Sequence, residues 1–222
     1  MGEAFWGASN LTIPATDAPD LSGVTSTLRM FRDATSFNSD INDWDTGGVV
    51  VMSEMFRGAT SFNQPLGNWD TSSAVYMDQM FLGATSFNQP LNSWNTGSLM
   101  YPTGMFYGAT SFNQPLGNWD TTDVVDMVWM FQQASSFNQD ISSWDVSNVA
   151  DMSQMFLGAT SFNQPLNNWN TSSVISTRHM FSHATSFNQP LNNWNTSSVN
   201  DMQAMFNNAY VFNQDISSWD VS

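Results

Sequence analysis

Cysteine and lysine are both absent from this chain, and arginine is scarce. Only 4 of its 222 residues are Lys or Arg, all of them Arg, against 19 Asp and Glu, so the formal net charge is −15. The absence of Cys excludes disulfides, thiolate zinc sites and a cysteine nucleophile. The shortage of cations argues against nucleic acid and anionic membrane surfaces as partners, because both are bound mainly through Lys and Arg.

Long apolar runs and enzyme motifs are also missing. No apolar run approaches the roughly 20 residues of a membrane span, so we expect no membrane insertion. Met1-Gly2-Glu3 opens the chain without the basic and apolar regions of a signal peptide. No glycine-rich phosphate loop occurs, and His179 and His183 stand four residues apart with no further ligand pattern around them. We therefore expect no enzyme, no cofactor and no metal site at these His residues.

Aromatic residues and methionine are abundant, and they repeat. The pair Met-Phe recurs every 25 residues from Met30-Phe31 to Met205-Phe206, and Trp recurs at the same step from Trp44 to Trp219. A fixed period of about 20 to 50 residues is typical of solenoids. We expect residues 1–222 to form a single solenoid of about eight and a half coils, with partial coils at 1–15 and 216–222.

Each coil can be interpreted as a strand followed by a helical turn. Leu66, Trp69 and Thr71 follow the L-x-x-L-x-L spacing of a leucine-rich-repeat strand, with Trp69 and Thr71 pointing inward. The apolar positions within 124–134 have the spacing of a short α-helix or 3₁₀ turn. The fold class predicted is an α/β repeat solenoid: a right-handed, leucine-rich-repeat-like stack with one short parallel strand and one short helix or 3₁₀ turn per coil.

The repeat resembles a known family. The segment 55–72, Met-Phe-Arg-Gly-Ala-Thr-Ser-Phe-Asn-Gln-Pro-Leu-Gly-Asn-Trp-Asp-Thr-Ser, and the lead-in at 5–21 are similar to the BspA-like leucine-rich-repeat surface proteins. The resemblance implies a bacterial, extracellular, cell-surface protein that acts in adhesion or ligand binding, without catalytic residues. Full-length members are expected to carry a secretion signal and a wall anchor, so we expect this chain to be a segment of a longer surface protein.

Residues that vary between coils are the candidates for ligand binding. The two positions after the core valine are apolar or aromatic in the central coils and polar at the ends, where they hold Thr25-Ser26 and Asn200-Asp201. Exposed apolar patches with aromatic members tend to be interaction sites. The alternative is that one of these columns is simply part of the core. The candidates for contact with an extracellular protein or glycan are Tyr76, Met100, Tyr101, Val125 and Trp129.

A polar strand face is the second candidate. Aspartates on it would lie about 4.8 Å from the equivalent residue of the next coil, where like charges repel. Such carboxylates could bind a calcium ion weakly, or a glycan. The alternative is a solvated face whose side chains bond to the backbone. The carboxylates concerned are Asp45, Asp70, Asp120 and Asp145.

Two other functions fit the repeat. An uncapped solenoid end exposes unpaired backbone groups, so copies of the chain could self-associate end to end into filaments. Regular Thr columns, from Thr46 to Thr196 and from Thr35 to Thr185, would suit an ice-binding face. Against that, the first column should point inward, where Val146 and Val221 replace Thr.

Overall fold

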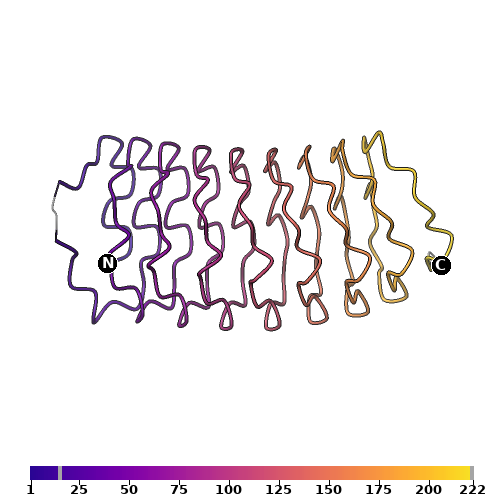
Figure 1. The fold of residues 1–222 in the computed structure, drawn as a ribbon, viewed down its shortest axis with the longest axis horizontal. Helices are drawn as coiled ribbons and strands as arrows, with labels where there is room; N and C mark the ends of the chain where they lie inside the picture. The colour runs from indigo at the N-terminus through magenta and orange to yellow at the C-terminus, as the bar shows by residue number, and fades with distance from the viewer. Residues whose placement is uncertain (15–16, 221–222) are drawn as a thin grey trace.

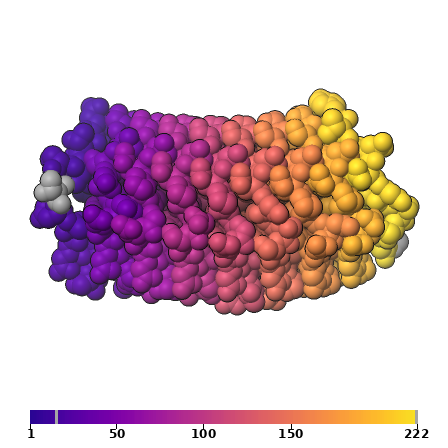
Figure 2. Space-filling view, viewed as in Figure 1, coloured from indigo at the N-terminus to yellow at the C-terminus, as the bar shows by residue number. Residues whose placement is uncertain are grey.

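The computed structural model describes residues 1–14 and 17–220. Figure 1 shows the chain winding into a row of similar coils, with the two ends of the chain at opposite ends of the row. In Figure 2 successive coils form side-by-side bands, indigo to yellow, along one elongated body. The repeat solenoid predicted from the period is confirmed. The predicted outer limits of the partial coils, at residues 15 and 222, lie outside the described residues, as does Val221.

Regular secondary structure is almost absent. Residues 1–14 and 17–220 contain no helix and no extended strand. Among these residues, strand-type pairing is limited to isolated parallel bridges at one residue per coil, and the strand expected at 66–71 is not formed. The bridges are Ser26–Val51, Val51–Tyr76, Tyr76–Tyr101, Asp126–Asp151, Asp151–Ser176 and Ser176–Asp201.

The helix or 3₁₀ turn expected within 124–134 is also not formed. Met130 N donates to Met127 O, as in a turn, but Trp129 N and Phe131 N donate to Ser153 O and Met155 O of the next coil. This alternation is possible because Trp129 has a φ of 60°, in the left-handed region. A right-handed helix cannot continue through such a residue. Consecutive turns therefore reproduce the apolar spacing of a helix without forming one.

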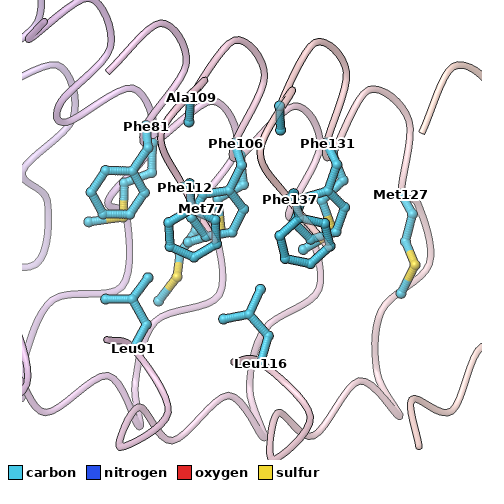
Figure 3. Packing of buried hydrophobic residues seen from close by; sticks show 14 of the residues in the cluster. Met77, Phe81, Leu91, Phe106, Ala109, Phe112, Leu116, Met127, Phe131 and Phe137 are labelled. Carbon is cyan, nitrogen blue, oxygen red and sulfur yellow. The ribbon is translucent and has the colours of Figure 1, made fainter. Parts of the chain in front are cut away.

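The inward-facing positions were predicted correctly. Trp69 and Thr71 are buried and Asp70 is exposed. Two phenylalanines per coil form parallel ladders, shown close up in Figure 3. Within one coil the rings of Phe106 and Phe112 are 4.2 Å apart, and Phe106 lies 5.6 Å from Phe131 in the next coil. Stacked coils thus bury the apolar face that no coil could bury alone.

Polar ladders run beside the aromatic ones. Asn88 Oδ1 accepts hydrogen bonds from Asn113 N at 2.9 Å and from Gln114 Nε2 at 3.0 Å, both in the next coil. The same pattern links Asn38 to Asn63 and continues along the chain to Asn213. The Asn-Gln segment was interpreted as a turn; its side chains also tie each coil to its neighbour.

Candidate functional site: a lateral row of exposed side chains

The bridging residues form one surface column, here called the lateral row. It contains one residue per coil at the same register, and every one of these residues is at least partly exposed. The neighbouring column, which includes Met100 and Val125, is half-buried on the central coils and bonds its amides to the preceding coil. Neither column is core, so the candidate positions lie at the surface. The lateral row consists of Ser26, Val51, Tyr76, Tyr101, Asp126, Asp151, Ser176 and Asp201.

The aromatic members of the site lie on the central coils. Tyr76 is 42% exposed, and its ring stacks on that of Tyr101, with centroids 5.2 Å apart and planes 2° from parallel. Trp129 is 36% exposed, three residues after the row. Every ladder aromatic between Phe31 and Trp194 is buried. The structure therefore brings Tyr76 and Tyr101 into contact and places Trp129 at the surface of the coil that follows Tyr101.

The lateral row changes from aromatic to acidic after Tyr101. Asp126 and Asp151 occupy the next two coils and are joined by a backbone bridge. Each carboxylate accepts a turn amide, from Val128 at 2.7 Å and from Ser153 at 2.8 Å. Partial burial raises the pKa of Asp126, the nearby charge of Asp151 raises it further, and the Val128 amide and Thr103 side chain oppose the shift. The sequence reasoning missed this acidic pair, although both residues belong to the candidate column.

A break in the backbone ladder lies at the same place. In the flanking coils Met77 N donates to Tyr101 O and Met127 N donates to Asp151 O. Pro102 occupies the equivalent position between them and has no N–H, so the carbonyl of Asp126 does not receive this bond. Gly104 follows, and a side chain at that position would meet Gln79 Cγ at 3.3 Å and Trp129 Cβ at 3.9 Å. Gly104 is buried, and the close approach of Gln79 leaves little room there for any larger residue.

The polar face has a structural role. Asp70 Oδ1 accepts the amide of Ser72 two residues later at 2.9 Å. Such bonds to the side chain and amide of the residue two positions on hold the pKa values of Asp70, Asp120 and Asp145 below their usual range. Asp45 closes its turn in the same way, through Gly47 N. Among the described residues, no three His, Cys, Asp or Glu side chains converge to hold a metal ion.

The threonine columns do not form one flat face. The column from Thr46 to Thr196 is buried, and its hydroxyls donate to carbonyls of the next coil, as Thr71 does to Asn95 O at 2.9 Å. The column that includes Thr60 is largely exposed, but its hydroxyl groups bond back to the preceding coil. His179 and His183 lie in turns rather than on a helix.

A partly buried ionic cluster near the beginning of the chain was missed by the sequence reasoning. Arg29, Arg32 and Arg57 all pair with Glu54, whose side chain is only 10% exposed. Trp6 covers Arg32, whose guanidinium carbon lies 4.7 Å from the ring centroid. One sequence signal could have indicated the cluster. Glu54 lies one repeat after Arg29, so opposite charges stack in adjacent coils, and Arg57 lies one repeat after Arg32. Because these pairs satisfy one another, we assign the cluster a structural role.

The residues that the structure describes form no helix with the length and apolar character of a membrane span.

Comparison with known proteins assigns a family. No curated protein and no solved structure matches the chain. One family model, described as "Mycoplasma protein of unknown function, DUF285", matches residues 1–115, 94–189 and 143–222, overlapping segments that together cover the repeats. The chain therefore belongs to the DUF285 family.

Proposed function

We propose that this chain is a non-enzymatic binding repeat that works at the cell surface, where it contacts a protein or glycan through the lateral row and Trp129. One observation carries the proposal. Tyr76 and Trp129 are 42% and 36% exposed on the central coils, whereas the ladder phenylalanines from Phe31 to Phe187 are fully buried. Large exposed aromatic side chains contribute strongly to binding, and they add little to the stability of a solenoid whose core is already packed.

The cellular setting comes from the sequence motif. Segment 55–72 resembles the BspA-like leucine-rich-repeat surface proteins, and those proteins act outside the cell in adhesion. A right-handed coil and a place in that wider group are part of the proposal. The matching family model describes proteins of unknown function, so it supports a repeat domain and leaves the ligand open.

The test is a screen of glycan and protein arrays with the chain and with a variant carrying Tyr76→Ser, Tyr101→Ser and Trp129→Ser. We expect the variant to lose the ligands that the chain binds while its melting temperature stays close to that of the parent. The matched control carries Tyr210→Ser and Val211→Ser, which remove exposed apolar side chains (78% and 47%) far from the central coils. Unchanged binding by the triple variant would refute the proposal.

End-to-end assembly is the second candidate. Hydrogen bonds between coils continue along the whole described stack, from the bond of Phe5 N to Met30 O to that of Phe181 N to Met205 O. Another coil in the same register could extend this pattern. Sedimentation velocity over a wide concentration range separates the two functions: a monomer that binds a ligand supports the first, and ordered fibres without a ligand support the second.

A further inference from the structure

We propose that the partner of the lateral row is a protein segment rich in Lys or Arg. This inference rests on the proposed function and specifies its ligand. The lateral row joins an aromatic half, Tyr76 and Tyr101, to an acidic half, Asp126 and Asp151, with exposed Trp129 beside the junction. A neutral glycan would use the aromatic half alone, whereas a basic segment uses both.

The acidic half lacks a cation of its own. All four Arg residues form ion pairs, and their acidic partners are Glu3, Asp33, Glu54 and Asp201. Neither Asp126 nor Asp151 is paired with Arg or His. The bridge between them holds the two carboxylates in adjacent coils, where like charges destabilise each other. A ligand cation placed there would remove that repulsion, so the surface is complementary to positive charge.

The aromatic half suits the same ligand. Lys and Arg bind over aromatic faces, with attraction that is stronger when water is excluded. The chain already contains such a contact, because the Arg32 guanidinium lies over Trp6 at 4.7 Å from the ring centroid. Lys and Arg also have apolar stems, which can pack on Tyr76 and Trp129 while their charged ends reach the carboxylates.

The ladder break lies at the acidic half as well. The Asp126 carbonyl lacks the bond from the preceding coil that Tyr101 and Asp151 receive, because Pro102 has no N–H. The carboxylate of this same residue has no ion-pair partner among the described residues. An ammonium group has three N–H donors and no acceptor, so it suits the carboxylate oxygens of the acidic half.

The direct test measures binding of fluorescein-labelled octalysine to the folded chain by fluorescence anisotropy, with octa-acetyl-lysine as the neutral probe. The test variant carries Asp126→Asn and Asp151→Asn. The control variant carries Asp120→Asn and Asp145→Asn, which lie six residues earlier and whose carboxylates accept amides in the same way. Both variants lose two negative charges and retain the side-chain oxygen that accepts the amide.

We expect octalysine to bind the parent and the control variant alike, and to bind the test variant about tenfold more weakly or worse. Raising the ionic strength should weaken the binding, and octa-acetyl-lysine should not bind. Equal losses in both variants would overturn the inference, because they would mean general attraction to an acidic chain. Absence of octalysine binding to the parent would overturn it as well.

Failure of this inference can be told apart from failure of the proposed function. A ligand from the array screen that is lost in the Tyr76, Tyr101 and Trp129 variant but retained by the Asp126 and Asp151 variant refutes the basic partner and leaves the proposed function standing. A ligand retained by both variants refutes both. Melting curves of each variant exclude loss of folding as the cause.

Discussion

The indole Nε1 of Trp94 donates a hydrogen bond of 2.9 Å to the carbonyl oxygen of Leu66 in the preceding coil. The same bond links Trp119 to Leu91 and recurs from Trp69 to Trp219. From Trp69 onward, each ladder tryptophan thus fills the core and also donates to a backbone carbonyl of the preceding coil. These side-chain bonds add to the backbone hydrogen bonds that link each coil to the next.

The asparagine ladder should be essential for stability. Asn113 Oδ1 accepts Asn138 N and Gln139 Nε2, both at 2.9 Å. We expect Asn113→Ala to leave these donors unpaired and to lower the free energy of unfolding by about 1–3 kcal/mol. Urea titration measures this loss. Asn118→Ala, at an exposed position, is the control, and its effect should stay within about 0.5 kcal/mol. Equal effects of the two changes would contradict the role of the ladder.

The turns should depend on left-handed residues. Gly83 has a φ of 69°, and an added Cβ would meet nothing closer than Gly58 at 3.9 Å. We therefore expect Gly83→Ala to destabilise the chain through backbone strain alone, by about 1 kcal/mol. Gly67 has an ordinary φ and equal space, with Ser93 Oγ at 3.7 Å. Gly67→Ala should be neutral or slightly stabilising, and a loss as large as that of Gly83→Ala would contradict the explanation.

Asp126 should lower stability at neutral pH. Its pKa in the folded chain is raised above the ordinary 3.8, mainly by burial, so its charged form is disfavoured by folding. This penalty is present above the folded pKa and disappears as pH falls toward 3.8. We expect Asp126→Asn to raise the melting temperature at pH 7 and to lose that advantage in acid.

Asp120, in the same coil, should have the opposite effect on stability at neutral pH. Its pKa is lowered by the bonds from Thr122, so its contribution to stability is present above 3.8 and is lost as pH falls through the lowered value. Asp120→Asn should therefore reduce the melting temperature at pH 7. Melting curves from pH 7 down to acid measure both effects, and a shift of the same sign for both variants would contradict these assignments.

Glu54 should hold the ionic cluster together. Removing its charge leaves Arg29, Arg32 and Arg57 close together without their shared partner. Loss of one partner from a buried ion pair typically costs about 3–5 kcal/mol, so we expect a destabilisation of about 3 kcal/mol for Glu54→Gln. Glu3→Gln removes an exposed partner of Arg29 and should cost less than about 1 kcal/mol. Chemical denaturation of both variants compares these values directly.

The period predicted the solenoid and the buried positions because the core repeats with the sequence. It could not predict the local backbone. The spacing from Val124 to Ala134 fits a helix equally well, and only the recurrence of Gly58, Gly83, Gly108 and Gly158 at one left-handed position indicated turns instead. Gln133 occupies that same position without a glycine, which concealed the signal.

The candidate site was predicted in part. The apolar column containing Tyr76 and Tyr101 was identified because it differs between the central and terminal coils. Asp126 and Asp151 belong to that column but were not included, since their proximity depends on the bridge register rather than on any local motif. For the Asp70 column the sequence left two interpretations open, a ligand face and a solvated face whose side chains bond to the backbone, and bonds of the second kind are present.

The central claim is that the aromatic residues divide into core ladders and a surface reserved for binding. Thermal melting of Trp94→Ser and Trp129→Ser tests it most directly, because the two variants delete the same side chain from a buried position, 3% exposed, and from an exposed one, 36% exposed. We predict a loss of about 3–5 kcal/mol or complete unfolding for Trp94→Ser and a melting temperature near that of the parent for Trp129→Ser. Comparable losses for the two variants would contradict the claim.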